Sequence, residues 1–429
     1  MAGKEPLVTT LKTCILSMQA EGCCPVTDTS LHLASFCEVL EMILRKGMTQ
    51  PVLGFKKRDY WTCLEECCQL DDCCRLPQLS VLVERTNSCE KLLSTQGRGR
   101  YFLRLALSRR FLGTALRHLV CTPKMQEWYD PQGSILAHED FREPFLSLVL
   151  VVSEMSFSLD LENSSFLDES WLLPVCGIYE TVPCRELGME LRYLEGRIFV
   201  TEVLPGSQTE IDEVVLAGDV IDEINGVSLR YAVNGQAGTV LNKLKGVPLK
   251  FRLIRWKWHD GAVYRPLLPY LKVLREKVPA FQLQHRPRDL EPREDRCLQD
   301  GRLLYVVRYL GQANVGVYGG KEVLDRGILM VLEQRLPSKE VMFDVKETEI
   351  IIKAKTPSQV LFRHSYPDIS SVGRRLDNAN IFALCTVDTK MFPPDTTFNC
   401  LVFQTNSSDQ CEEIIKRIAT GFKHTEWFV

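Results

Sequence analysis

The sequence predicts a multidomain protein that begins with an all-α helical bundle and continues with two sheet-rich domains. Three observations lead to this fold class. Apolar residues recur at helical spacing through much of residues 1–175. Period-two alternation bounded by Gly and Pro turns dominates residues 175–258. A longer series of short strands, closed by one helix, occupies residues 301–427 of the 429-residue chain.

The composition is that of an ordinary globular protein, with 45% hydrophobic and 25% charged residues. A net charge of −3 gives no argument for a nucleic-acid partner. No long apolar run follows the N-terminus, and the most apolar stretch, residues 144–152, is too short to span a bilayer. The 17 cysteines are then expected to be reduced thiols. We therefore expect a cytoplasmic protein without a transmembrane segment, with peripheral membrane contact as an alternative.

Helical periodicity in the first domain predicts helices at residues 31–44, 100–119 and 143–157. The family resemblance rests on the motifs LEMILRKGM (40–48), GRYFLRLAL (99–107), EWY (127–129), FSLDL (157–161) and LD (167–168). In this order they resemble a RUN domain, with a core at residues 30–168. RUN domains are helical bundles, and several bind small GTPases of the Rap and Rab families. The resemblance therefore implies a partner of that type.

Arg100 and Arg104 are the candidate GTPase-facing residues of this domain. They stand four residues apart and share one face of a predicted helix. The alternative is that these arginines belong to an ordinary charged helix face or to structural ion pairs.

The cysteine cluster from Cys63 to Cys74 (C-x3-CC-x4-CC) has three interpretations. Zinc requires four convergent ligands, usually in short-spaced pairs, whereas adjacent cysteines on a helix point about 100° apart. Buried structural thiols are therefore favoured. A zinc site and a palmitoylated membrane contact are the alternatives, and we predict no metal or other cofactor.

Residues 186–229 carry the strongest motif of the second domain. The tripeptide Leu187-Gly188-Met189 precedes an alternating run, and GDVIDEINGVSL (218–229) contains the hairpin signal Asn225-Gly226. This arrangement resembles a PDZ domain, which is a small, partly open α+β barrel. The resemblance implies that Leu187, Gly188 and Met189 form the loop that binds a peptide carboxylate, and that the peptide adds as a strand beside the following strand.

The second wall of this groove is a helix predicted at residues 234–245. The resemblance implies that Ala237 faces the ligand side chain two before the terminus and that Leu241 lines the groove below it. Because alanine offers no side-chain hydrogen bond, we expect an apolar ligand side chain there.

Residues 259–300 are predicted to be a linker, because HRPRDLEPRED at 285–295 is charged, proline-bearing and without apolar period. Within it, residues 264–274 are apolar enough for a short docked helix.

Strands in the last domain are expected at 303–310, 341–345, 349–354, 359–364, 369–373, 380–387 and 398–404, with helices at 320–334 and 408–425. Together with YLG (309–311), FALC (382–385) and NCLVF (399–403), this order resembles a phosphotyrosine-binding (PTB) domain. That fold is a PH-like β-sandwich or barrel capped by a C-terminal helix.

The PTB resemblance implies a groove for an internal peptide motif beside one strand and the last helix. Its residues would be Ile369, Ser370, Ser371, Val372 and Phe422. The alternative for Phe422 is a purely core position. Whether binding depends on phosphotyrosine stays open, although basic residues stand nearby in the sequence at Arg363, Arg374 and Arg375.

The C-terminal Trp427-Phe428-Val429 is itself a candidate ligand for the PDZ-like groove, which would permit self-association through Val429. Packing of the helix end is the alternative.

No P-loop, G-x-S-x-G, H-E-x-x-H or C-x-x-C motif occurs. We therefore expect a non-enzymatic adaptor or scaffold in signalling or vesicle trafficking. The alternatives are a regulator of a small GTPase cycle and a lipid-anchored trafficking factor.

Overall fold

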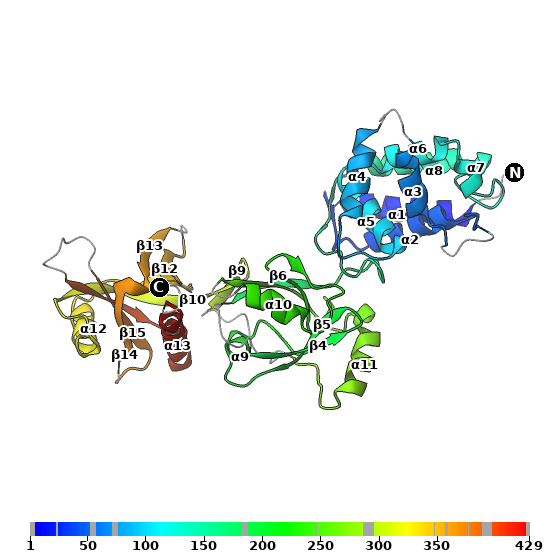
Figure 1. Ribbon diagram of the computed structural model, residues 1–429. Helices are drawn as coiled ribbons and strands as arrows, with labels where there is room; N and C mark the ends of the chain where they lie inside the picture. Colours follow the sequence, from blue (N-terminus) through cyan, green and yellow to red (C-terminus); the bar gives the residue numbers. More distant parts are fainter. Residues whose placement is uncertain are drawn as a thin grey trace. The chain divides into compact units, whose positions relative to one another are not determined.

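The chain divides into two compact units in the computed structural model (Figure 1). The helical unit comprises Met1–Val175 with Trp256–Pro269, and the sheet unit comprises Cys176–Arg255 with Tyr270–Val429. The structure describes residues 5–22, 25–51, 57–70, 76–181, 188–244, 247–285, 296–346, 348–356, 359–375, 377–387 and 397–425.

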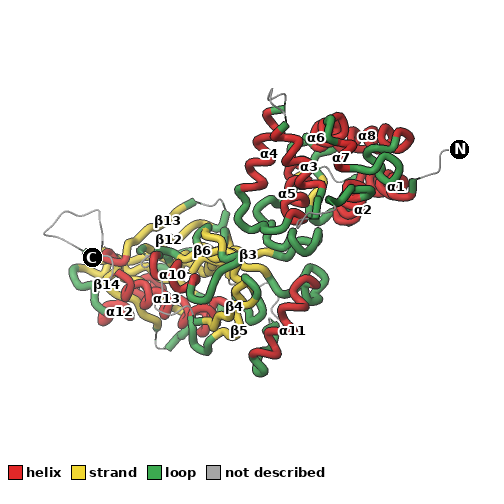
Figure 2. Tube along the Cα trace, turned by 45° about the vertical axis from the view of Figure 1, so that its right-hand side comes forward, coloured by secondary structure: helices red, strands yellow, loops and turns green. Residues whose placement is uncertain are grey.

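The helical unit is a bundle, drawn from blue to cyan in Figure 1 and in red in Figure 2. Its helices are α1 (Pro6–Ala20), α2 (Leu33–Arg45), α3 (Tyr60–Gln69), α4 (Pro77–Asn87), α5 (Thr95–Ser108), α6 (Leu112–Cys121), α7 (Met125–Trp128) and α8 (Glu139–Glu154). The short strands β1 (Val26–Thr27) and β2 (Phe157–Ser158) pair in parallel beside them. Apolar side chains at helical spacing, such as Leu40, Phe102 and Leu116, are completely buried.

The single helix predicted at residues 100–119 is wrong, because α5 and α6 are separate helices. Arg110 adopts a left-handed φ of 53°. The Phe111 N–H then reaches back to the Ala106 carbonyl at 2.8 Å, which is the pattern of a Schellman stop. An arginine at this position gives no sequence signal for the stop, since glycine is the usual residue.

The first sheet of the sheet unit is antiparallel, with the strand order β3-β8-β6-β5-β4 and β7 paired to β6. Its elements are β3 (Cys176–Thr181), β4 (Met189–Leu194), β5 (Arg197–Val203), α9 (Gln208–Asp212), β6 (Val220–Ile224), β7 (Val227–Ser228), α10 (Gln236–Lys243) and β8 (Leu249–Ile254). Strand β4 stands at one end of this order. The predicted Asn225-Gly226 hairpin is confirmed, because both residues have positive φ between β6 and β7.

The linker predicted at residues 259–300 is wrong at both ends. Trp256–Pro269 belongs to the helical unit, where the Tyr264 hydroxyl donates to the Leu172 carbonyl at 2.6 Å. The next segment forms α11 (Leu268–Lys277) after the 3-10 turn η1 (Arg265–Leu267), and β9 (Arg296–Gln299) already pairs with the second sheet. Residues 286–295 lie outside the described residues.

The second sheet has the order β13-β12-β11-β10-β16-β15-β14, with β9 on β10. Its strands are β10 (Arg302–Gly316), β11 (Lys339–Val345), β12 (Glu349–Ala354), β13 (Val360–Ser365), β14 (Ile369–Arg374), β15 (Ile381–Val387) and β16 (Phe398–Gln404). The other elements are the 3-10 turns η2 (Lys321–Val323) and η3 (Tyr366–Asp368), and the helices α12 (Leu324–Glu333) and α13 (Ser408–Thr425). Figure 2 shows α12 and α13 in red beside the yellow strands.

The start of α13 is fixed by local hydrogen bonds. The Ser407 hydroxyl accepts from the Gln410 N–H at 3.1 Å, and the Gln410 side chain accepts from the Asn406 N–H at 3.1 Å. Ile414 and Ile418, one turn apart, are then buried against the second sheet with Phe403.

Candidate functional site

Arg100 and Arg104 do not lie on the surface of the helical unit. Arg100 is 8% exposed and forms an ion pair with Glu41 at 3.1 Å. Arg104 is 2% exposed and forms an ion pair with Asp28 at 2.7 Å. The prediction that they face a GTPase is therefore corrected, because both guanidinium groups are buried in ion pairs inside the bundle.

Glu41 is the acceptor that holds several parts of the bundle together. Besides Arg100 of α5, its carboxylate accepts from the Trp171 indole N–H at 2.7 Å and lies 3.1 Å from the guanidinium of Arg45. Tyr60 of α3 contributes a weaker contact at 3.4 Å. Trp171 follows α8 in the chain, so one buried carboxylate joins α2, α5 and the segment that leaves the bundle.

Exposed apolar side chains are present on three helices of the helical unit. Leu16 of α1 and Met42 of α2 are each 54% exposed, and Leu150 and Val151 of α8 are exposed beside one another in sequence. Helix α1 packs against both α2 and α8. Large exposed apolar patches are typical of protein-binding surfaces, so these helices are candidates for such a surface.

The loop predicted to bind a carboxylate is described only in part. Leu187 lies outside the described residues. Gly188 has a left-handed φ of 71°, and its carbonyl accepts from the Leu204 N–H at 2.8 Å and from the Ser207 hydroxyl at 3.2 Å. Met189 is buried and begins β4, the edge strand of the first sheet.

Half-buried apolar side chains of β4 and α10 pack on the buried core of the first sheet. They are Leu191 and Tyr193 of β4, and Val240, Leu241 and Leu244 of α10. These residues and β4 make up the candidate β4–α10 groove. The role of Leu241 in lining a ligand site stays a prediction.

Ala237 differs from its predicted role. Its side chain is 1% exposed, and its N–H donates to the Tyr193 hydroxyl at 3.0 Å. Tyr193 was missed by sequence reasoning, although the alternation Met189, Leu191, Tyr193 places it on the groove side of the strand.

Strand β14 is at one end of the order of the second sheet, and β13 is at the other. Ile369 and Ser371 are buried, Ser370 is exposed and Val372 is half-buried. The hydroxyls of Ser370 and Ser371 both donate to the Gly319 carbonyl, at 2.6 and 2.9 Å. Two adjacent side chains reach one acceptor because the pairing register shifts between Ile369 and Ser371.

Phe422 lies half-buried on α13 and makes an edge contact with the Tyr366 ring at 5.2 Å between centroids. Helix α13 also packs against β14. Phe422 therefore contacts the core from a half-buried position, and its role in a peptide groove stays a prediction.

The basic residues that stand near β14 in the sequence are paired with carboxylates, and Arg363 lies on β13, at the other end of the sheet order. Arg363 contacts Glu349 at 3.2 Å and Arg374 contacts Glu412 at 3.7 Å. Arg375 pairs with Asp377. These contacts provide no concentrated phosphate-binding charge among the described residues of this strand.

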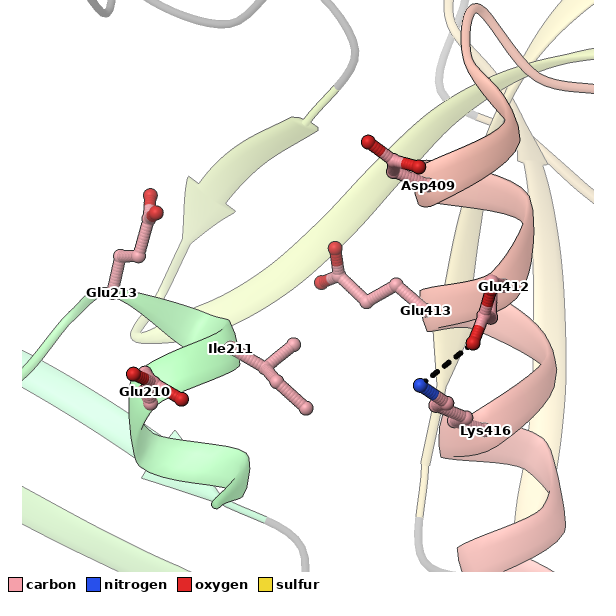
Figure 3. A pocket seen from close by; sticks show the side chains of 7 residues that line it. All are labelled: Glu210, Ile211, Glu213, Asp409, Glu412, Glu413 and Lys416. Carbon is pink, nitrogen blue, oxygen red and sulfur yellow. Dashed lines mark ion pairs between the residues drawn. The ribbon is translucent and has the colours of Figure 1, made fainter. Parts of the chain in front are cut away.

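A cavity of about 510 Å³ separates α9 from α13 (Figure 3). Glu210, Ile211 and Glu213 line one side, and Asp409, Glu412, Glu413 and Lys416 line the other. Arg296 partly neutralises this acidic lining, at 3.6 Å from Glu413 and in a hydrogen bond of 2.5 Å with Glu213. Burial raises the pKa of Glu413.

Beside this cavity, a buried ion pair joins the two sheets. Asp212 of α9 and Arg417 of α13 are 3% and 5% exposed and are hydrogen-bonded to each other. Asp212 also accepts from the Tyr179 hydroxyl at 2.5 Å, and the guanidinium of Arg417 lies over the Tyr305 ring at 5.6 Å. The first and second sheets are thus connected by charges that are removed from solvent.

The cysteine cluster is only partly described, because Cys73 and Cys74 lie outside the described residues. Cys63 and Cys67 are buried, and burial raises the pKa of Cys63 to about 12. Among the residues that the structure describes, no group of three or more His, Cys, Asp and Glu side chains is arranged to hold a metal ion. Val429 and its neighbours from residue 426 onward are also outside the description.

Within the described part of the chain, none of the helices combines the length and the apolar composition that crossing a bilayer requires.

Comparison with known proteins identifies the type of domain that the helical unit contains. Residues 35–163 match the RUN domain, so the bundle around α2 to α8 is a RUN domain. The similar curated proteins are RUN and FYVE domain-containing protein 4 of Mus musculus, 31% identical over 160 residues, and of Homo sapiens, 32% identical over 163 residues. Each match covers 37% of this chain and 27% of the relative, so the chain matches about a quarter of the length of these relatives.

Proposed function

We propose that this protein is a non-enzymatic cytoplasmic adaptor. Its RUN domain binds a small GTPase of the Rap or Rab type, and its two sheets bind peptide segments of other proteins. The observation that carries the proposal is the combination of a RUN domain at residues 35–163 with two sheets whose edge strands, β4 and β14, each face a helix. When one chain carries several binding sites, a partner bound at one site is held close to the partners bound at the others.

A PDZ-like role for the first sheet is supported by three features. Among the described residues β4 pairs with β5 alone, so its other side could accept an added peptide strand. Gly188 supplies a left-handed backbone at the start of that strand, as a carboxylate-binding nest requires. The β4–α10 groove provides apolar walls for the ligand side chains.

A PTB-like role for the second sheet is supported by β14 and α13. An internal peptide would extend the sheet beside β14 and place an apolar side chain on the accessible part of Phe422. Since the nearby arginines are paired with carboxylates, we propose recognition that does not depend on phosphotyrosine.

For the GTPase we propose the apolar surface of α1, α2 and α8 as the contact. Leu16, Met42, Leu150 and Val151 are exposed there, whereas Arg100 and Arg104 are buried. Apolar and aromatic contacts desolvated on binding are the usual source of affinity at such interfaces.

The test is capture of the full chain on immobilised Rap and Rab proteins, each loaded with GDP or with a non-hydrolysable GTP analogue. We expect retention on one GTP-loaded member, and a loss of about tenfold or more in affinity for the double variant L150D/V151D. Leu329→Asp is the matched control, because Leu329 is 46% exposed on α12 of the sheet unit. Equal retention of the double variant, or no dependence on the bound nucleotide, would contradict the proposed GTPase role.

A further inference from the structure

The two sheets of the sheet unit meet at a junction of opposite charges. Within the described part of the chain, three arginines on elements of the second sheet each pair with a carboxylate on an element of the first. The pairs are Arg302 of β10 with Glu180 of β3, Arg296 of β9 with Glu213 at the end of α9, and Arg417 of α13 with Asp212 of α9. Charged contacts of this kind within one chain are typical of modules that can move relative to each other.

A close backbone contact accompanies these ion pairs. Gly301, in the turn between β9 and β10, accepts the N–H of Glu180 at its carbonyl at 2.8 Å. Strand β3 is at one end of the order of the first sheet, so this turn lies against its outer edge. Gly301 has a φ of 86°, and a Cβ there would stand 2.7 Å from the Ile178 Cγ2 and 3.2 Å from the Ile178 backbone. A glycine is therefore required for the turn to approach β3 this closely.

Each arginine of the junction also has a partner on its own side. These partners are Asp344 of β11 for Arg302 at 3.1 Å, Glu413 of α13 for Arg296 at 3.6 Å, and the Tyr305 ring for Arg417 at 5.6 Å from the guanidinium carbon to the ring centroid. Figure 3 shows Glu213 and Glu413 on opposite sides of the cavity between α9 and α13. The three guanidinium groups would therefore keep a partner if the two sheets moved apart.

The carboxylates of the first sheet are provided for in the same way. Asp212 accepts from the Tyr179 hydroxyl at 2.5 Å and from the Gln208 side-chain amide at 2.7 Å, and both donors belong to its own side. The side chains of Glu180 and Glu213 are 20% and 35% exposed, so water already reaches them. Opening the junction would thus separate charges that remain solvated or hydrogen-bonded, rather than leave one of them buried alone.

We propose that this junction is a conformational latch between the two sheets. In the closed state, which the structure shows, the β9–β10 turn covers the outer edge of β3 and the ion pairs hold α9 beside α13. In the open state both sheets stay folded but separate, and the backbone groups at the edge of β3 become exposed for pairing with another strand. The latch thus controls the exposure of an edge strand. This inference does not depend on the proposed peptide binding by either sheet.

The test is amide hydrogen exchange of the full chain, measured by mass spectrometry on peptides from β3 and, as a reference, from the inner strands β5 and β16. Gly301→Ala prevents the close approach of the turn, so we expect exchange in β3 to become about tenfold faster while β5 and β16 stay protected. Gly316→Ala is the matched control in the second sheet. Gly316 has a φ of 88° and nothing lies within 4 Å of a Cβ there, so this variant should leave exchange in β3 unchanged.

Ionic strength tests the contribution of the ion pairs. Raising NaCl from about 50 mM to about 500 mM should accelerate exchange in wild-type β3 about threefold relative to β16, because salt screens charges that are partly exposed. In Gly301→Ala, where the latch is already open, salt should have little effect.

Three results would overturn the proposal. Equal exchange of β3 in the two glycine variants would mean that the turn does not cover the edge. Faster exchange in β5 and β16 together with β3 would mean that the sheets unfold as one body instead of separating. Exchange of wild-type β3 that does not respond to salt would mean that the ion pairs do not hold the junction closed.

Discussion

The buried carboxylate of Glu41 accepts hydrogen bonds from side chains on three other segments of the helical unit. Replacing it in Glu41→Gln leaves the Arg100 guanidinium buried without a counter-charge. Because an uncompensated buried charge costs about 3–5 kcal/mol, we expect a loss of that order in the free energy of unfolding, measured with urea. Glu38→Gln, an exposed change on the same helix, should cost little. A loss below about 1 kcal/mol in Glu41→Gln would contradict this account of the site.

Gly188 and Gly206 form a natural pair for a second residue-scale prediction. Their φ values are 71° and 73°, so an alanine suffers the same backbone strain at both positions. At Gly188 the new Cβ would also stand 2.3 Å from the Ser207 Cβ, whereas at Gly206 nothing lies within 4 Å. We expect Gly188→Ala to cost about 1–3 kcal/mol more stability than Gly206→Ala, and to abolish binding of C-terminal peptides.

Calorimetry of both glycine variants measures the difference in stability, and titration with C-terminal peptides measures the loss of binding. Peptide affinity reduced equally in the two variants would show that backbone strain alone, rather than the contact with Ser207, affects the loop.

At the scale of elements, α13 connects the second sheet to the first through Arg417. Arg417→Met leaves Asp212 buried without its cation, and we expect a loss of about 3–5 kcal/mol in unfolding free energy. The double variant D212N/R417M should recover most of the loss, since it removes both charges. Lys416→Met, on the exposed side of α13, is the matched control.

Chemical denaturation followed by circular dichroism measures the unfolding free energy of each variant in this double-mutant cycle. Additive losses in the double variant would mean that the two charges do not depend on each other.

Elements with a strong local pattern were predicted to within a residue or two. The strands β12 and β16 and the helix α13 have the predicted bounds, because alternation, helical periodicity and the Ser407–Gln410 cap all lie inside the segment itself. The break between α5 and α6 and the helix α9 were missed. The start of α9 has a sequence signal, because the Ser207 hydroxyl accepts the Glu210 N–H as an N-cap. The stops of α5 and α9 lie at Arg110 and Glu213 in left-handed conformations, which these residue types do not reveal.

At the scale of the whole chain, Cys176–Arg255 stands between two segments that fold together in the helical unit. After β8 the chain returns, and the Tyr264 hydroxyl and the Trp258 indole donate to the carbonyls of Leu172 and Leu173. We expect Tyr264→Phe to accelerate amide hydrogen exchange in the segment around Leu172 by about tenfold, because one anchoring hydrogen bond is lost.

Tyr318→Phe, in an exposed position, is the control for Tyr264→Phe. Unchanged exchange near Leu172 would mean that the returning segment does not stabilise the end of the RUN domain. A practical consequence is that GTPase binding is best measured on the full chain, since a fragment ending at residue 175 lacks Tyr264 and Trp258.

The sequence by itself determined the order of a helical region and two sheet-rich regions, the Asn225-Gly226 hairpin and the position of Gly188 before an end strand of its sheet. These features follow from periodicity and turn chemistry, which act between residues near one another in the chain. Only the tertiary structure decided that Arg100 and Arg104 are buried, that residues 256–269 return to the helical unit and that Tyr193 of β4 accepts the N–H of Ala237 of α10. Those features depend on contacts between segments that are distant in the chain. They could not be predicted, because a residue's type defines its charge and size but not the residue that it contacts.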